Sequence, residues 1–300
     1  MKVKRIILLL TILACTLVAW GRPDWKTIEV DGADREYLLD LPSDLTKPCP
    51  LIVVFHGGGG NARQARRSSG FSRLADSGYI LVYPNGENGR WQIGMTDHPK
   101  YDTSIDDTRF ISLLLDQLES EYPVDSERVY ATGASNGGMM SHLVGIELSD
   151  RFVAIAPMIG GITSEMEKSF PPPNEVSVLI MQGTDDPLVP YKGGPVTIGR
   201  KKWGRLLPTE QAAKIWAEHN RCDSSLTEQL PDTVEDECRV ELTNWTGGKN
   251  GSEVLLYKVI GGGHTAPGGM QYLPESVIGT VCRDIHAVDV IEKFFRRHHK

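Results

Sequence analysis

The feature that most constrains the fold is a short glycine-flanked turn in the middle of the chain. Residues 133–137 read Gly-Ala-Ser-Asn-Gly, follow the strand-like run 128–132 and precede the apolar stretch 139–148, which can form a helix. Glycines at both ends let a backbone turn this sharply without a side-chain clash. The pattern therefore predicts a strand, a tight turn with Ser135 at its tip, and a helix.

Strand-like and helix-like segments alternate along the rest of the chain. Strands that are apolar throughout indicate a mostly parallel sheet covered by helices on both faces. No repeat, low-complexity tract or linker divides the sequence, so we predict one α/β domain over residues 22–300. The strand-like runs include 50–55, 79–83, 152–157, 176–181 and 254–260, the helical patterns include 106–122 and 287–298, and residues 27–41 form a predicted hairpin.

Residues 1–21 have the layout of a secretory signal peptide. A basic start is followed by the apolar run 6–14 and by small residues at Ala19 and Gly21, which match a cleavage site. The run is barely long enough to span a membrane. We therefore predict a secreted protein, extracellular or periplasmic, without stable membrane insertion. A lipid anchor at Cys15, which follows Ile-Leu-Ala, is the minor alternative.

The net charge limits the possible binding partners, and the cysteine content indicates the redox compartment. The chain has 32 basic and 39 acidic residues, a net charge of −7, which disfavours nucleic acid or an anionic membrane as partner. Four cysteines remain after the leader, an even number that suits an oxidising compartment. Cys222 and Cys238 flank a turn-rich segment and are the favoured disulfide pair, with free buried thiols as the alternative. No Cys-x-x-Cys spacing supports a metal site.

A serine hydroxyl is a poor nucleophile at neutral pH, so Ser135 needs a base and an acid that orients the base. With this type of turn, the chain order is serine, then acid, then histidine. His264 follows the strand-like run 254–260 through three glycines and lies in a loop, which makes it the predicted base. The other histidines far enough downstream lie in predicted helices or at the tail: His219, His286, His298 and His299.

Two neighbouring aspartates are candidates for the acid. Asp185 and Asp186 both follow the strand-like run 176–181, and the spacing alone does not choose between them. Either carboxylate could instead serve a turn or a cap, which the Asp-Pro pair favours.

Hydrolysis of an ester also requires donors for the oxyanion of the tetrahedral intermediate. The amide of Asn136, directly after Ser135, is one candidate. The loop His56-Gly57-Gly58-Gly59-Gly60 can supply a second, for which Gly58 is chosen, with the neighbouring glycines left open. Asn61-Ala-Arg follows these glycines in place of Lys-Ser/Thr, which argues against a phosphate-binding loop.

Five segments together resemble the secreted esterases that are grouped with polyhydroxybutyrate depolymerases and feruloyl or acetylxylan esterases. The resemblance covers nearly the whole chain after the leader and implies an α/β-hydrolase fold. In that family the acid directly precedes x-x-Val-Pro-Tyr, which corresponds to Asp186, while the base corresponds to His264 and the nucleophile to Ser135. No metal or organic cofactor is implied. The segments are 56–61, 105–111, 133–140, 183–191 and 261–268.

Two departures from the family bear on the substrate. Ala266 stands where the family often has tryptophan, which removes an aromatic wall near the base. The chain also ends at the last predicted helix, whereas dedicated polyester depolymerases usually continue into a polymer-binding module. The expected substrate is therefore a feruloyl, acetyl or similar ester on plant polysaccharide, with polyhydroxybutyrate or its oligomers second.

Aromatic residues near predicted loops are candidates for substrate contact. Trp91, Tyr191 and Trp203 could stack on sugar or phenolic rings, with ordinary packing as the alternative. Asp106 and Asp107 match the family but are expected to cap and charge a helix N-terminus. A serine peptidase and a non-catalytic carbohydrate-binding relative are the remaining functions. A binding protein has no need for a full serine, histidine and aspartate set, which argues against the latter.

Overall fold

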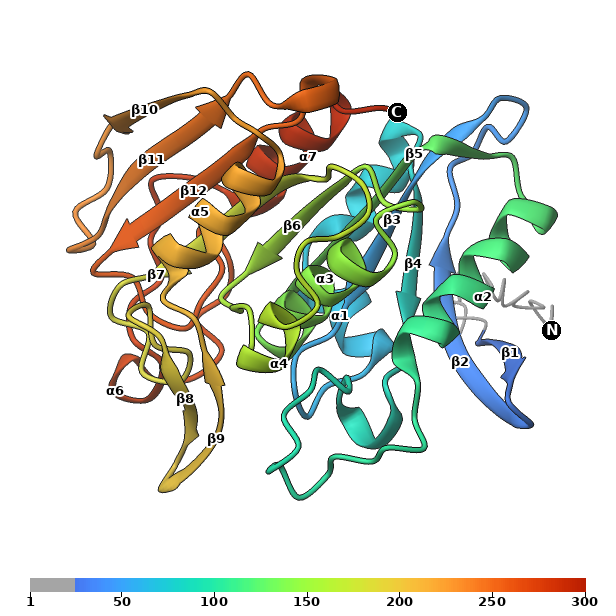
Figure 1. Ribbon diagram of the computed structural model, residues 1–300, viewed down its shortest axis with the longest axis horizontal. Helices are drawn as coiled ribbons and strands as arrows, with labels where there is room; N and C mark the ends of the chain where they lie inside the picture. The colour runs from blue at the N-terminus through green and yellow to red at the C-terminus, as the bar shows by residue number, and fades with distance from the viewer. Residues whose placement is uncertain (1–24) are drawn as a thin grey trace, which may run out of the picture.

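The computed structural model describes residues 25–300. A ten-stranded sheet runs through its centre in the order β1-β2-β4-β3-β5-β6-β7-β12-β11-β10 (Figure 1). The strands are β1 Lys26–Val30, β2 Ala33–Asp40, β3 Cys49–Phe55, β4 Ile80–Pro84, β5 Val124–Ala134, β6 Ala154–Met158, β7 Ser177–Gly183, β10 Ser224–Gln229, β11 Arg239–Thr246 and β12 Val254–Ile260. A separate hairpin consists of β8 Gly194–Ile198 and β9 Lys201–Leu206.

The central part of the sheet is parallel. Strands β4, β3, β5, β6, β7 and β12 pair in parallel, whereas the pairs toward both edges are antiparallel. Side chains along β3 alternate between the two faces, since Leu51 and Val53 join one core cluster and Ile52 and Val54 the other. A strand with two covered faces must be apolar at every position. The predicted mostly parallel sheet is confirmed.

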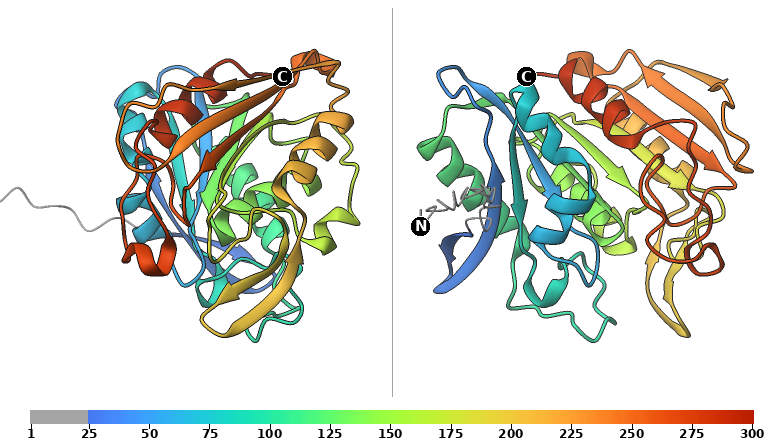
Figure 2. Two further views of the ribbon diagram at one scale, coloured as in Figure 1. Left: turned by 90° about the vertical axis from the view of Figure 1, so that its left-hand side faces the viewer. Right: turned by 180° about the vertical axis from the view of Figure 1, so that it is seen from behind.

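Helices cover both faces of this sheet (Figures 1 and 2). Apolar side chains of α2, α3 and α5 pack on one face, and those of α1, η1 and α7 pack on the other. The helices are α1 Ala62–Ser68, α2 Asp107–Glu121, α3 Asn136–Glu147, α4 Ser164–Glu167, α5 Thr209–His219, α6 Glu275–Ile278 and α7 Ala287–Arg296, with 3-10 turns η1 Phe71–Ser77, η2 Glu87–Gly89 and η3 Lys249–Gly251.

The predicted leader, residues 1–21, and the alternative anchor at Cys15 lie outside the described residues. Within residues 25–300, no helix combines the length and the apolar character needed to cross a membrane.

The favoured pairing of Cys222 with Cys238 is wrong. Strands β10 and β11 are antiparallel, with Ser224 opposite Thr246 and Gln229 opposite Glu241, so the two cysteines lie at opposite ends of this hairpin. Cys238 lies instead beside Cys282. Both are buried free thiols, and their sulfur atoms lie within 4.8 Å of one another.

We expect Cys238 and Cys282 to form a disulfide when the unfolded protein is refolded with oxidised glutathione, which accepts the two electrons that the thiols lose. In the folded protein, burial raises the pKa of Cys238 to about 12 and that of Cys282 to about 11, so little reactive thiolate is present. Mass spectrometry of non-reduced peptides measures the link. A Cys222→Ser variant should keep it, and a peptide joining Cys222 to Cys238 would contradict the expectation.

Candidate active site

Ser135 lies at the tip of the predicted turn between β5 and α3. Its backbone has φ 57° and ψ −120°, a conformation that residues with a side chain rarely adopt. The Ser135 amide donates to the carbonyl of Met158 at 2.9 Å, and its carbonyl accepts from the amide of Met139 at 2.9 Å. Strand β6 and helix α3 therefore hold the strained turn from both sides.

The flanking glycines are required because backbone atoms approach them closely. A Cβ atom on Gly133 would lie 2.7 Å from the backbone of Gly137, and one on Gly137 would lie 2.5 Å from the carbonyl oxygen of Phe55. A Cβ on Gly138 would lie 2.5 Å from the carbonyl oxygen of Met158. Any larger residue at these positions would push the turn away from β3 and β6.

His264 and Asp186 form a buried pair. His264 Nδ1 lies 2.7 Å from Asp186 Oδ2, and the two residues are only 3% and 6% exposed. Asp186 Oδ1 accepts from the amides of Leu188 and Val189, both at 2.8 Å, and Oδ2 also accepts from Gln182 Nε2 at 3.0 Å. An ionised carboxylate is only an acceptor, so the proton between the pair belongs on Nδ1. In the neutral ring this leaves Nε2 free to accept a proton.

The structure distinguishes the two aspartates that the sequence left open. Asp185 is exposed and accepts from the hydroxyl of Thr184 at 2.8 Å, whereas Asp186 turns inward to His264. Consecutive residues of this turn point in opposite directions.

The serine and the His264–Asp186 pair lie at the same edge of the sheet. Strands β5, β6, β7 and β12 are neighbours and parallel, so the loops after them meet at their carboxyl ends. Within residues 25–300, no hydrogen bond joins the Ser135 hydroxyl to the His264 ring. Such bonds are often long in hydrolases without substrate. The structure thus brings acid and base into contact and places the serine at the same edge of the sheet.

The glycine loop after β3 lies against the turn. A Cβ atom on Gly57 would lie 3.9 Å from Ser135 Cβ, and one on Gly58 would lie 3.6 Å from Asn136 Cβ. Both predicted oxyanion positions, Gly58 and Asn136, are therefore neighbours.

Hydrogen bonds hold this loop while leaving donors free. The Gly59 amide donates to the carbonyl of Gly89 at 2.7 Å, and the Gly60 amide donates to the carbonyl of Gly57 at 3.0 Å. In the described part of the chain, the Gly58 amide has no backbone acceptor. The Asn136 amide is at the first position of α3, where helical amides lack an intrahelical partner.

Trp91 is buried and only 1% exposed, so its predicted contact with substrate is wrong. Its amide donates to Asn136 Oδ1 at 2.8 Å, its carbonyl accepts from Asn136 Nδ2 at 3.3 Å, and its indole Nε1 donates to the carbonyl of His56 at 2.9 Å. Trp91 thus joins the residue after the serine to the start of the glycine loop.

The other two aromatic candidates differ from each other. Tyr191 is 8% exposed, and its hydroxyl donates to Glu210 at 3.2 Å, so most of its ring is packed inside the protein. Its contact with substrate stays a prediction. Trp203, in β9, is half-buried and packs on His98 with ring centroids 4.6 Å apart. Trp203 stays a candidate for substrate contact.

His56 braces the glycine loop, a role that the sequence analysis missed. Its Nε2 accepts from the amide of Gly86 at 2.9 Å, so Nδ1 carries the proton and donates to the carbonyl of Gly57 at 2.8 Å. Burial lowers the pKa of His56, which keeps the ring neutral. The sequence feature that could have indicated this role is the position of His56 between a buried strand and four glycines.

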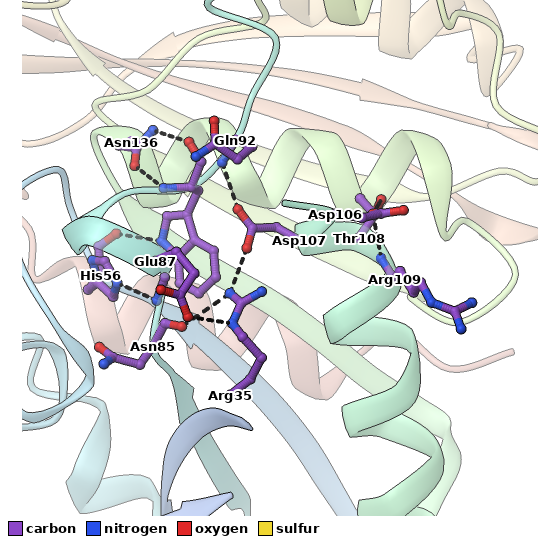
Figure 3. Close-up of polar contacts among 12 residues, drawn as sticks. Arg35, His56, Asn85, Glu87, Gln92, Asp106, Asp107, Thr108, Arg109 and Asn136 are labelled. Carbon is purple, nitrogen blue, oxygen red and sulfur yellow. Dashed lines mark hydrogen bonds and ion pairs between the residues drawn. The ribbon is translucent and has the colours of Figure 1, made fainter. Parts of the chain in front are cut away.

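Asp107 also has a larger role than predicted. Asp106 caps helix α2 as expected, accepting from the Arg109 amide at 2.9 Å. Asp107 is 2% exposed and accepts from Arg35 Nη2 and from the Gln92 amide, both at 2.7 Å (Figure 3). Burial raises the pKa of Asp107, and the Arg35 guanidinium opposes this shift. Asp107 therefore joins β2 to the segment that carries Trp91.

We expect Asp107→Ala to lower the free energy of unfolding by about 3 kcal/mol, because it leaves the buried Arg35 guanidinium without its closest partner. The neighbouring Asp106→Ala variant loses only an exposed cap and should cost about 1 kcal/mol. Urea unfolding of both variants measures the difference. Equal losses would mean that the buried Arg35–Asp107 pair contributes no more to the free energy of unfolding than the exposed cap.

Several known proteins resemble the chain in sequence. Residues 39–170 match the profile of the BD-FAE family. The chain is 29% identical over 283 residues to NocK of Nocardia uniformis subsp. tsuyamanensis, whose name assigns it provisionally to the esterases, and the match covers 90% of this chain and 81% of NocK. Feruloyl esterase B of Piromyces equi is 28% identical over 239 residues, which are 77% of this chain but 42% of that protein.

The fold has counterparts among solved structures. The acetyl xylan esterase from Aspergillus awamori superposes with a TM-score of 0.60 at 15% identity, over 78% of this chain and 92% of that one. At 15% identity, this similarity supports the fold and nothing more. The matching sheet, the turn at Ser135 and the sequence matches lead to one conclusion: the chain has the α/β-hydrolase fold and is related in sequence to proteins named as esterases.

Proposed function

We propose that the chain is a carboxylic ester hydrolase that works by acyl transfer through Ser135, His264 and Asp186. The observation that carries this proposal is the strained turn of Ser135, held against the glycine loop at the same sheet edge as the buried His264–Asp186 pair. A buried histidine that is bonded to a carboxylate on Nδ1 is suited to act as a base through Nε2.

In the proposed reaction, Ser135 Oγ attacks the ester carbonyl while His264 Nε2 takes its proton. Asp186 stabilises the imidazolium, and the amides of Gly58 and Asn136 donate to the oxyanion. His264 then gives the proton to the departing alcohol, which leaves an acyl-enzyme. Water, deprotonated by His264, releases the carboxylic acid and restores Ser135. These steps need no metal or organic cofactor.

The proposed substrate is a feruloyl, acetyl or similar short acyl ester linked to plant polysaccharide. Sequence similarity to a protein named feruloyl esterase supports this substrate class. Two aromatic rings could replace the wall missing at Ala266. One is the half-buried ring of Trp203, and the other is the ring of Tyr272, whose hydroxyl donates to the His264 carbonyl at 3.3 Å. We also propose that residues 1–21 direct secretion.

Oligomers of hydroxybutyrate are the second candidate substrate. Four large apolar side chains in the segment after His264, which ends in α6, are exposed and could bind an apolar polyester: Met270, Tyr272, Leu273 and Val277. Contiguous exposed apolar surface is typical of binding sites.

The test is a panel of initial rates for the wild type and Ser135→Ala. The panel contains methyl ferulate, acetylated xylan, 4-nitrophenyl acetate, hydroxybutyrate oligomers and a peptide amide. We expect ester hydrolysis that depends on Ser135, with the fastest turnover on a polysaccharide ester. Faster amide turnover would indicate a peptidase. Equal rates in the variant, or carbohydrate binding without hydrolysis, would overturn the proposed mechanism.

A further inference from the structure

Arg90 lies next to the glycine loop, and within residues 25–300 no ion pair joins its guanidinium to an acid. Burial alone lowers the pKa of Arg90, and no neighbouring carboxylate opposes that shift. Glu87 pairs with Arg35 at 3.3 Å, and Asp97 accepts from the Gly204 amide at 2.8 and 2.9 Å, so these two acids of the same segment have other partners.

The backbone on both sides of Arg90 is anchored to the proposed oxyanion site. On one side, the Gly89 carbonyl accepts from the Gly59 amide at 2.7 Å. On the other, the Trp91 amide donates to Asn136 Oδ1 at 2.8 Å. Residue 90 thus lies between the glycine loop and the residue that follows Ser135, and its position does not depend on a flexible segment.

The side chain of Arg90 turns toward the same loop. A Cβ atom on Gly58 would lie 3.3 Å from Arg90 Nη1 and 3.6 Å from Asn136 Cβ. The guanidinium and the turn at Ser135 therefore border the same face of Gly58. Arg90 is half-buried, and none of its nitrogen atoms is among the fully buried groups without a partner, so its donors open to solvent.

His98 lies near Arg90. Burial and the charges of Arg90 and Lys100 lower the pKa of His98, and the Asp97 carboxylate opposes this shift, so the ring stays neutral and the surroundings hold charges of both signs. The His98 ring packs on Trp203, an aromatic candidate for substrate contact. An arginine with free donors in a half-buried wall is suited to bind a carboxylate, since its planar fork can donate two parallel hydrogen bonds.

We propose that Arg90 binds a carboxylate on the alcohol part of the ester substrate and gives the enzyme a preference for esters that carry this negative charge. The inference rests on the proposed function. Its acyl groups, feruloyl and acetyl, are neutral, so the charge belongs to the alcohol. A uronate beside an acylated sugar has this chemistry, and so has the free carboxyl end of a hydroxybutyrate oligomer.

The test compares two esters of matched shape, 3-carboxyphenyl acetate and 3-carbamoylphenyl acetate, which differ in charge. We expect Arg90→Gln to lower kcat/KM for the carboxylate ester about tenfold or more and to change the neutral ester less than about twofold. The loss should be mainly in KM, because the contact exists before and during the reaction. Arg90→Lys should recover part of it, and added salt should weaken the wild-type preference.

Arg109→Gln is the matched control, since Arg109 is exposed and paired with Asp31 at 3.0 Å, and it should change neither rate. A pair of hydroxybutyrate dimers, acid and amide, and acetylated xylan oligomers with and without uronate then distinguish the two sources of charge. Unchanged rates in Arg90→Gln, or equal losses on both phenyl esters, would overturn the proposal.

A binding measurement separates failure of this proposal from failure of the proposed function. Calorimetry with 3-hydroxybenzoate, the charged product, should give binding to the wild type that is about tenfold weaker in Arg90→Gln. If no ester is hydrolysed but this difference is found, the proposed function is wrong and the carboxylate site stands. If esters are hydrolysed but binding is equal, the Arg90 proposal is wrong.

Discussion

Replacing His264 by alanine is expected to lower kcat/KM for 4-nitrophenyl acetate by about 10⁵-fold. In the proposed mechanism the variant lacks the base for the Ser135 proton, and we expect the remaining rate to come from the oxyanion donors and substrate binding. Initial rates measure the loss. Because the serine and its base act as a unit, the double variant with Ser135→Ala should be no slower than either single variant.

His286→Ala is the control for this experiment, because His286 is exposed at the start of α7 and its ring lies 3.7 Å from Asp289, not against Asp186. It should keep wild-type activity. A His264→Ala enzyme within tenfold of the wild type would exclude His264 as the base. Thermal unfolding of each variant ensures that a lost rate is not a lost fold.

Asp186→Asn is expected to lower kcat by about 10⁴-fold. An asparagine amide that donates to His264 Nδ1 would favour the tautomer with the proton on Nε2, and that tautomer cannot accept the proton of Ser135. The shape of the side chain is nearly unchanged, so the contacts with the amides of Leu188 and Val189 can persist. Steady-state rates on 4-nitrophenyl acetate measure the effect.

Asp185→Asn is the matched control, because Asp185 is the exposed neighbour that the sequence could not tell apart from Asp186. It should leave kcat within about twofold, as expected for a surface substitution away from the reacting atoms. A large loss in Asp185→Asn with little change in Asp186→Asn would reverse the assignment of the acid.

The turn at Ser135 and the parallel sheet were predictable from sequence because their causes are local. Gly133 and Gly137 meet backbone within 2.7 Å, a constraint that only glycine satisfies and that five consecutive residues reveal. The two-sided burial of β3 likewise follows from its unbroken run of apolar residues. Backbone sterics and side-chain periodicity act over a few residues, so these features can be predicted from the sequence alone.

Burial and partners of polar and aromatic residues depended on the tertiary structure. Trp91 lies in an irregular segment where no periodicity indicates burial, yet its three hydrogen bonds join residues that are 35 and 45 positions away. Arg35 and Asp107, 72 positions apart, meet only because β2 and the start of α2 are brought together. The sequence also could not predict that Arg90 has no acidic partner within residues 25–300, because this depends on which acids pair with other residues.

The cysteines show the same division. Their even number was read from the sequence, but the antiparallel register of β10 and β11 separates Cys222 from Cys238 and places Cys238 beside Cys282. The sequence by itself determined the α/β architecture, the position of Ser135 on its turn and the loop of His264, because these follow from local backbone geometry. Only the tertiary structure decided which groups face one another, because strand register and loop packing bring distant residues together.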